Sequence, residues 1–427
     1  MKKKILVRGP VLSRSGYGEQ ARFAARSLRK HKDEYDIYLL NIGWGETGWI
    51  WEDDEERRWL DLLLIKTQHY IAKGGNFDIS LQITIPNEWE KMAPINIGYT
   101  AGIESTRIAP QWIEKCDLMD KIIVVSNHAK YGFDNTVYVR TDNNTSETMD
   151  DYRNTTPIEV VHYPVRDHKP ADIDLNLELD FNFLNVAQWG PRKNLENTVK
   201  WFVEEFYDKP VGLVVKGFIK NNSVCDRHYS NLKMEEMLSD YPDRKCKVYM
   251  LHGDMTDAEM TALYQHPKIK AMVSLTHGEG YGLPLFEAAY NGMPLIAPDW
   301  SGHLDFLYVP VTARDKKAKK KSKSRKRMQP MFARVAYDLK HIPPAAVWEG
   351  VLEKDSMWCY PQQGSSKMVM RDMYNNYKKY QTMAKKLETH IRKNFTQDKL
   401  YDDFVSAISS ETSTQQELPQ RVEAFMV

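Results

Sequence analysis

Two glutamates in a glycine-rich stretch are the residues of this chain best suited to chemistry. Residues 277–305 have the sequence HGEGYGLPLFEAAYNGMPLIAPDWSGHLD, in which Glu279 and Glu287 stand eight positions apart. A helix is predicted to begin near Leu283, because Pro284 suits a first helical turn, where its missing N–H costs nothing. A helix N-terminus attracts phosphate through its unpaired amides and its dipole. A carboxylate can accept hydrogen bonds from the paired hydroxyls of a ribose or a sugar.

The same stretch resembles the Glu-x7-Glu motif of the family 4 retaining glycosyltransferases, which have the GT-B fold. The resemblance implies that Glu279 and the loop amides after it hold the donor sugar, and that Glu287 holds the nucleotide ribose. The small residues of the loop predict that a ligand approaches its backbone closely. A structural turn with solvated acids is the alternative, but glycines, proline and both glutamates together are more specific than a lone glycine pattern. The donor-binding residues expected here are Glu287, Gly280, Tyr281, Gly282 and Leu283.

A second stretch, FLNVAQWGPRKNL at residues 183–195, predicts cations beside the same ligand. A strand ends there in a loop with Arg192 and Lys193, and cations in that place would neutralise the leaving diphosphate. The resemblance implies an arginine and a lysine for this task; Lys193 matches the lysine, whereas Gln188 stands at the usual arginine position, so Arg192 is expected to substitute. Two solvated cations in a loop are the alternative. Lys216, which ends the next predicted strand, is a further donor-binding candidate. The expected catalytic residues are Glu279, Arg192 and Lys193.

The loop SGYG at residues 15–18 precedes another predicted helix. By the resemblance, such a loop faces the donor phosphates and the acceptor, which makes Gly16 and Gly18 donor-binding candidates and Tyr17 an acceptor candidate. Residues 16–21 also satisfy the G-x-G-x-x-A pattern of a nicotinamide site. That alternative fares badly, because the glycines lie well past the predicted strand end at Val7 and the second strand ends without an acid.

The segment GYTAGIESTRIAPQW at residues 98–112 resembles the acceptor side of the same family. Many members have a histidine in this place, but the chain has Tyr-Thr-Ala at residues 99–101. Glu104 and Arg107 are the polar candidates nearby, and a tryptophan-containing loop near Trp44 could stack on an acceptor. The acceptor candidates are Tyr17, Glu104, Arg107 and Trp44.

Short apolar runs alternate with longer helical patterns along most of the chain, which predicts an α/β protein of parallel βαβ units. The fold class expected is two Rossmann-like domains facing each other across a cleft (GT-B), with a C-terminal helix that packs back toward the N-terminal domain. A polar loop is expected over residues 138–156 and one long helix over residues 367–392. The predicted domains are residues 1–165 on the acceptor side, 166–395 for the nucleotide sugar, and 396–427 as helix end and polar tail.

The bulk composition is that of a globular protein, with 42% hydrophobic and 27% charged residues in 427. No run of about 18 apolar residues occurs, and the four cysteines are scattered, which predicts a cytoplasmic protein with reduced thiols. Residues 314–327 contain ten basic side chains and one acid, a net charge of +9, so in a chain of net charge +1 the other residues total −8. Such a segment either binds a polyanion, DNA or an anionic membrane, or is a solvated insertion.

The function expected from the resemblance is transfer of a hexose from a UDP- or GDP-linked donor, with no metal or other cofactor. The acceptor expected is a glycan or a lipid-linked glycan, reached at the membrane surface through residues 314–327. The alternative is a hydroxymethylated base in DNA, since the N-terminal stretch RGPVLSRSGYGEQAR resembles glycosyltransferases of large tailed phages. Two further hypotheses are a sugar-nucleotide epimerase of the same fold and an inactive binding module.

Overall fold

A sheet of six parallel strands forms the N-terminal half, in the order β2-β1-β3-β4-β5-β8. The computed structural model describes residues 2–141, 146–313 and 325–410. Every residue of β3 and β5 is buried, as is usual when helices cover both faces of a parallel sheet. The six strands are β1 (Lys3–Gly9), β2 (Tyr35–Asn41), β3 (Ile79–Ile83), β4 (Ile95–Thr100), β5 (Lys121–Val124) and β8 (Ile158–Val160).

A second parallel sheet forms the C-terminal half, in the order β11-β10-β9-β12-β13-β16. Its strands β10 and β13 are again buried throughout. The strands are β9 (Asn182–Val186), β10 (Gly212–Lys216), β11 (Lys247–Leu251), β12 (Ile269–Val273), β13 (Leu295–Pro298) and β16 (Ala333–Val335). Three antiparallel pairs lie outside the two sheets: β6 (Tyr138–Thr141) with β7 (Thr148–Tyr152), β14 (Tyr308–Ala313) with β15 (Arg325–Pro330), and β17 (Tyr337–His341) with β18 (Met357–Pro361).

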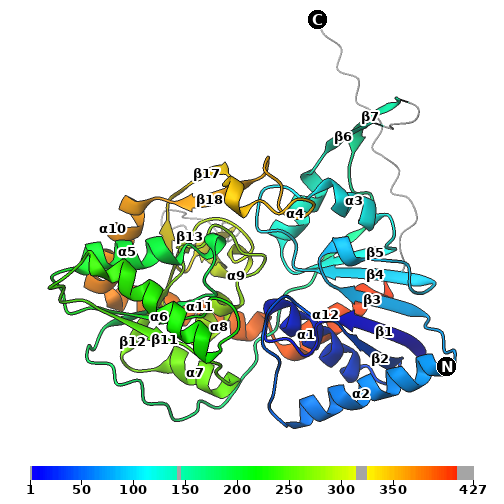
Figure 1. Cartoon of the computed structure of the whole chain (residues 1–427), viewed down its shortest axis with the longest axis horizontal. Helices are drawn as coiled ribbons and strands as arrows, with labels where there is room; N and C mark the ends of the chain where they lie inside the picture. Colours follow the sequence, from blue (N-terminus) through cyan, green and yellow to red (C-terminus); the bar gives the residue numbers. More distant parts are fainter. Residues whose placement is uncertain (1, 142–145, 314–324, 411–427) are drawn as a thin grey trace, which may run out of the picture.

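Helices surround both sheets, and the two halves lie side by side (Figure 1). Several helices begin at side-chain caps: Ser15 accepts a hydrogen bond from the backbone of α1, and Thr256 forms a capping box with Glu259 at the start of α7. None of the helices in the described part of the chain has an apolar stretch long enough to cross a membrane. The helices are α1 (Gly16–Lys30), α2 (Glu55–Ala72), α3 (Pro110–Cys116), α4 (Asn127–Asn135), α5 (Leu195–Phe206), α6 (Val224–Ser239), α7 (Asp257–Gln265), α8 (Leu283–Tyr290), α9 (Leu304–Leu307), α10 (Gln363–Asn375), α11 (Tyr377–Asn394) and α12 (Gln397–Ser409), with short 3₁₀ turns η1 (Pro86–Glu88), η2 (Pro191–Lys193) and η3 (Pro344–Ala346).

The last helix returns to the N-terminal half, as the sequence predicted. Phe404 on α12 is fully buried, and its ring lies 5.1 Å from that of Phe23 on α1 and 5.0 Å from that of Tyr99 on β4. Figure 1 shows α12 beside α1, whereas α11, which directly precedes it, lies beside α8 in the C-terminal half. The predicted domain boundary after residue 165 falls in the stretch between β8 and β9, and the boundary itself stays a prediction.

Two local predictions were wrong. Residues 138–156 contain the hairpin β6–β7 rather than a loop, because Tyr138 and Tyr152 pack on the apolar cluster of α3 and β5. The long helix predicted over residues 367–392 is two helices, α10 and α11, which meet at Asn376. The helix is interrupted there because the backbone of Asn376, with φ −117° and ψ 35°, departs from helical values. Most of the basic segment, residues 314–324, and the tail from residue 411 lie outside the described residues.

Removal of the Phe404 ring should test how much α12 contributes to stability. We expect Phe404→Ala to lower the free energy of unfolding by about 3–5 kcal/mol, since a large buried aromatic leaves a cavity. Chemical denaturation checks this. The matched control is Leu62→Ala, which truncates a side chain that is 66% exposed on α2 and should cost less than about 0.5 kcal/mol. Equal losses for the two variants would contradict the packing described for α12.

Candidate active site

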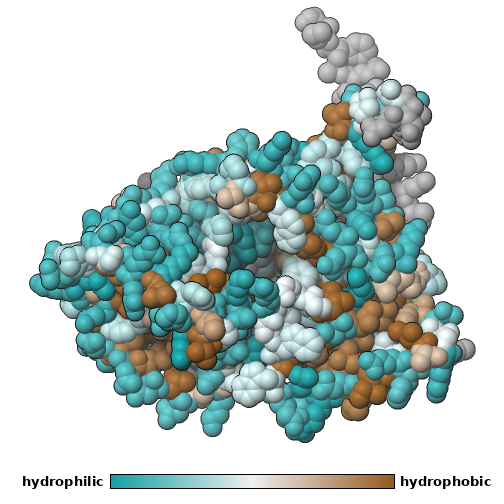
Figure 2. Space-filling model, in the orientation of Figure 1, coloured by the Kyte–Doolittle hydropathy of each residue, from teal (hydrophilic) through white to brown (hydrophobic). Residues whose placement is uncertain are grey.

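A cavity of about 1340 Å³ lies between the two halves, and both contribute to its walls. Figure 2 shows the surface hollowed between them. The loops after β1, β4, β9, β10 and β12 supply lining residues, so the cavity lies at the carboxyl ends of strands from both sheets, where open α/β sheets bind ligands. The two motifs singled out in the sequence, residues 277–287 and 192–193, line this same cavity.

The carboxylate of Glu279 lies between two cations. Lys193 Nζ lies 2.6 and 2.8 Å from its two oxygens, and Arg192 Nη1 lies 3.3 Å from Oε2. Burial by itself would raise the pKa of Glu279, but the charges of Lys193 and Arg192 outweigh it and lower the pKa to about 2. Burial and Arg192 lower the pKa of Lys193. The three side chains form a partly buried charge cluster at the carboxyl end of β9 and β12.

Backbone packing between the halves fixes the turn that presents Glu279. A Cβ on Gly278 would lie 2.5 Å from the carbonyl oxygen of Glu104, and a Cβ on Gly280 would lie 2.6 Å from that of Ala101. Ser126 Oγ donates to the Gly280 carbonyl at 2.6 Å. The nearest neighbours of a side chain at Gly278 or Gly280 are therefore backbone atoms of the N-terminal half. Gly280 also lines the cavity, and the close approach of a ligand to this loop stays a prediction.

Gly282 has a different task, because it begins helix α8. Its φ of +88° is in the left-handed region, which glycine adopts without strain. Pro284 then occupies the first turn of α8, as predicted. Tyr281, Gly282 and Leu283 all line the cavity, and Tyr281 is 3% exposed.

Glu287 lies one turn into α8 and lines the cavity beside Tyr264 of α7. The Tyr264 hydroxyl donates to Glu287 Oε2 at 2.9 Å. Burial raises the pKa of Glu287 to about 7, although the hydrogen bond from Tyr264 opposes this shift. The carboxyl group therefore changes its charge near neutral pH.

Arg192 contacts both the N-terminal half and the turn that contains Glu279. Its Nη2 lies 3.2 Å from the Glu104 carboxylate, and its Nη1 donates to the Gly278 carbonyl at 2.6 Å. Gln188, at the expected arginine position, lines the cavity and donates to the carbonyl of Ile219 at 3.1 Å. The cation between the Glu279 and Glu104 carboxylates is thus Arg192.

Lys216 ends strand β10 and lines the cavity. Its Nζ donates to the Gly253 carbonyl at 2.5 Å, and burial lowers its pKa. The charged end is therefore at the cavity wall, at the carboxyl edge of the second sheet.

In the N-terminal glycine loop, some residues line the cavity and one glycine is needed for close packing. Gly16 and Tyr17 line the cavity, whereas a Cβ on Gly18 would collide with the carbonyl of Ser13, so Gly18 is required by close packing. The Tyr17 hydroxyl hydrogen-bonds Thr100 Oγ1 at 2.8 Å. The Tyr17 ring lies 4.2 Å from that of Trp44, which also lines the cavity.

The two polar acceptor candidates have different positions. Glu104 lines the cavity, with its carboxylate paired to Arg192. Arg107 lies apart from the described lining residues; its guanidinium forms an ion pair with Asp355 at 2.5 Å and stacks over the ring of Tyr138. Arg107 therefore links the halves at the edge of the cavity.

Sequence reasoning missed several residues that hold the site together. Ser301 Oγ accepts from the backbone of Glu279 at 3.0 Å, and Ser301 has a φ of +86°. Arg166 lies 3.2 Å from Glu19 of α1 and 2.9 Å from Asp257 of α7, so it bridges the halves inside the cavity. Arg166 is far in sequence from both acids, so no local sequence pattern indicates these ion pairs. Ser301, in contrast, stands within the glycine-rich motif and could have been found there.

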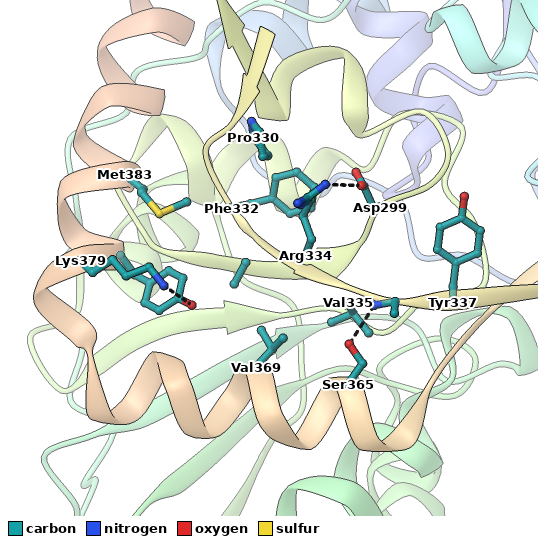
Figure 3. A pocket seen from close by; sticks show the side chains of 13 residues that line it. Asp299, Pro330, Phe332, Arg334, Val335, Tyr337, Ser365, Val369, Lys379 and Met383 are labelled. Carbon is teal, nitrogen blue, oxygen red and sulfur yellow. Dashed lines mark hydrogen bonds and ion pairs between the residues drawn. The ribbon is translucent and has the colours of Figure 1, made fainter. Parts of the chain in front are cut away.

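A second cavity of about 640 Å³ lies between β16, α10 and α11 (Figure 3). Arg334 pairs there with Asp299 at 3.1 Å, and the Ser365 hydroxyl accepts from the backbone of Ala336. None of the site residues predicted from the sequence lines this cavity, among those that the structure describes.

Solved structures with the same architecture span nearly the whole chain. Anabaena HepE, crystallised with UDP and glucose, superposes with a TM-score of 0.58 at 11% identity, over 95% of this chain and 99% of that chain. Sucrose-phosphate synthase of Thermosynechococcus elongatus superposes with a TM-score of 0.59 at 11% identity, over 95% of this chain and 98% of that chain. The lipopolysaccharide outer core galactosyltransferase WaaB superposes with a TM-score of 0.52 at 11% identity, over 95% of this chain and 99% of that chain. The chain has the GT-B fold. The predicted fold class is thereby confirmed. No protein-family model matches the sequence, and no curated protein is significantly similar to it.

A side chain at Gly280 should force the turn that contains Glu279 away from the N-terminal half. We expect Gly280→Ala to lower the melting temperature by several degrees, because its Cβ would overlap the Ala101 carbonyl. Differential scanning calorimetry checks this. Gly364→Ala is the matched control, since a Cβ there meets no atom within 4 Å. A melting temperature unchanged by Gly280→Ala would contradict the close approach of the two backbones.

Proposed function

We propose that this protein is a glycosyltransferase that takes a hexose from a UDP- or GDP-linked sugar and transfers it to an acceptor hydroxyl with retention of configuration. The observation that supports this best is that two acids and two cations line one cavity between the halves of a GT-B fold. They are Glu279, Glu287, Arg192 and Lys193. The similarity of fold to HepE, which was crystallised with UDP and glucose, supports a nucleotide-sugar donor.

Glu287 is suited to bind the ribose of the donor. A carboxylate accepts several hydrogen bonds, and the Tyr264 hydroxyl supplies one of those available to Glu287. Glu287 lies on α8 in the wall of the cavity. In our proposal, the ribose hydroxyls donate the further hydrogen bonds that its carboxylate accepts. Tyr264 then acts as a positioning residue, because it fixes the orientation of the carboxylate.

Lys193 and Arg192 are suited to bind the diphosphate. A diphosphate competes with Glu279 for these cations, since charge-assisted hydrogen bonds to phosphate oxygens resemble those to a carboxylate. Glu279 then turns its oxygens to the hydroxyls of the donor sugar. When the diphosphate replaces Glu279 as the partner of the two cations, the cations bind the diphosphate and Glu279 binds the sugar, which are the roles predicted for them.

The retaining course follows from the resemblance to family 4 and proceeds as a front-face displacement. The acceptor oxygen forms a bond to the anomeric carbon while the bond from that carbon to the diphosphate oxygen breaks. The departing phosphate takes the acceptor proton, and Lys193 and Arg192 stabilise its developing charge. Closure of the halves around the cavity excludes water and so limits hydrolysis of the donor.

Nucleotide-sugar affinity should depend on pH through Glu287. The ionised carboxylate is the form that accepts two ribose hydroxyls, and its pKa is about 7. Binding of UDP-glucose or GDP-mannose should therefore tighten as the pH rises, with a Kd about tenfold lower at pH 8 than at pH 6. Isothermal titration calorimetry measures it. Glu287→Gln should bind more weakly and lose the pH dependence, and an unchanged profile in that variant would contradict the assignment.

Loss of one cation should slow the reaction strongly. We expect Lys193→Met to lower donor turnover by about 10²–10³, the usual effect of removing one group that stabilises transition-state charge. The assay follows release of nucleoside diphosphate from UDP- and GDP-sugars, without acceptor and with a panel of glycans. Lys200→Met, at an exposed lysine of α5, is the control and should keep full activity.

The same assay separates glycosyl transfer from epimerisation and from simple binding. An epimerase would convert the donor without any acceptor, and a binding module would bind it without turnover. A glycosyltransferase turns over faster when its acceptor is present. Absence of both binding and turnover across the UDP- and GDP-sugars would contradict the proposed function.

A further inference from the structure

The connection between β17 and β18, residues 342–356, extends from the C-terminal half to the N-terminal half. In Figure 1 it extends from β17 and β18 toward α3 and α4. Its end is fastened to the loop after β4: the backbone of Thr106 donates to the Met357 carbonyl at 3.2 Å, and Thr106 Oγ1 accepts from the backbone of Met357 at 3.0 Å. The connection therefore joins the two halves, and several of its residues line the cavity.

The tip of this connection is anchored in the N-terminal half. Val351 is 6% exposed and belongs to the apolar cluster that contains Trp112. The Gly350 carbonyl accepts from Asn87 Nδ2 at 2.8 Å, and Asn87 Oδ1 accepts from the Trp112 indole at 2.6 Å. A tip held by both burial and hydrogen bonds is a rigid part of the wall.

This anchor positions one aromatic side chain. Trp348 and Leu352 exchange two backbone hydrogen bonds, of 3.0 and 2.6 Å, which close a tight turn around Gly350. The Trp348 side chain lines the cavity, yet Trp348 is 61% exposed. An exposed indole on a rigid turn offers a flat apolar face at low entropic cost.

Apolar side chains accompany Trp348 in the cavity lining. Ala346 and Leu352 of the connection and Ile103 of the N-terminal half line the same cavity. Trp358 is also among the lining residues, but it is 2% exposed and its indole nitrogen is buried. Of Trp348 and Trp358, Trp348 is therefore the one whose ring a ligand can reach.

The charges near this wall are largely paired. Residues 342–356 contain three acids and one lysine, and the facing residues 85–91 contain two acids and one lysine. Arg107 pairs with Asp355, Arg8 with Glu90, and Arg192 with Glu104. These residues together offer the phosphates of DNA or of a lipid no surplus of positive charge, so an uncharged acceptor suits this side better.

We propose that Trp348 and the β17–β18 connection form the acceptor subsite, and that the acceptor is an uncharged sugar whose apolar ring face stacks on Trp348. This proposal rests on the proposed function and names its acceptor class. Sugars combine an apolar face with hydroxyl groups, which matches a cavity lined by an exposed indole and by polar side chains such as Glu104. The specificity for the acceptor thus comes in part from the half that binds the donor.

Binding of small sugars to the full-length protein tests this. The probes are methyl glycosides of glucose, galactose, mannose and N-acetylglucosamine, and a DNA duplex that contains 5-hydroxymethylcytosine. Ligand-observed NMR measures each Kd for the wild type, Trp348→Ala and Tyr229→Ala. The last variant removes an aromatic ring that is 63% exposed on α6, away from the cavity lining.

We expect at least one glycoside to bind the wild type and Tyr229→Ala alike, and to bind Trp348→Ala at least tenfold more weakly. Trp348→Phe should restore most of the affinity, since it keeps an aromatic face. Equal glycoside binding by wild type and Trp348→Ala overturns the proposal, and so does binding of the duplex in place of every glycoside.

Donor affinity, measured separately with UDP-glucose and GDP-mannose, distinguishes the two proposals. It should be unchanged within twofold in Trp348→Ala, because Trp348 belongs to the acceptor side. Failure of the wild type to bind either nucleotide sugar would contradict the proposed function, whereas sugar binding that is insensitive to Trp348 contradicts the acceptor subsite alone.

Discussion

The contact on which the rest of the site depends is the pairing of one buried carboxylate with two partly buried cations. Glu279 comes from the turn after β12, whereas Arg192 and Lys193 come from the turn after β9. The buried carboxylate needs these partners, because an unpaired ion there is far less stable than in water. The pairing therefore holds two turns of the C-terminal sheet at a fixed separation, in the wall of the large cavity.

That charge cluster is completed by the other half of the molecule. Glu104 pairs with Arg192, and the backbone of residues 101–104 lies against Gly278 and Gly280. The turn that presents Glu279 is thus shaped by the N-terminal half as much as by its own sheet. A motion that separates the halves must break these contacts together, so the position of Glu279 is coupled to the arrangement of the two domains.

Further interdomain contacts surround the same cavity. Arg166 joins α1 to α7 at one side, and the β17–β18 connection joins the halves at the other, where Arg107 pairs with Asp355. α12 adds an apolar contact through Phe404. Arg166 and its two acids line the cavity, whereas Arg107 and Asp355 lie outside its lining. The apolar contact of Phe404 lies against α1 and β4. The cavity is therefore bordered by charged groups, as the proposed binding of a nucleotide sugar requires.

The sequence by itself determined the repeating elements and the local motifs. The predicted helix start near Leu283 and strand end at Lys216 agree with α8 and β10, because apolar runs, helix-starting residues and turn residues act over a few positions. Only the tertiary structure decided which groups meet: Gly278 with Glu104, Ser126 with Gly280, and Trp348 with the cavity. These partners are far apart in the chain, and their meeting depends on how two separately formed sheets pack. Periodicity and spacing describe neighbours along the chain, so they predicted the chemistry of each side chain but not the surface that it faces.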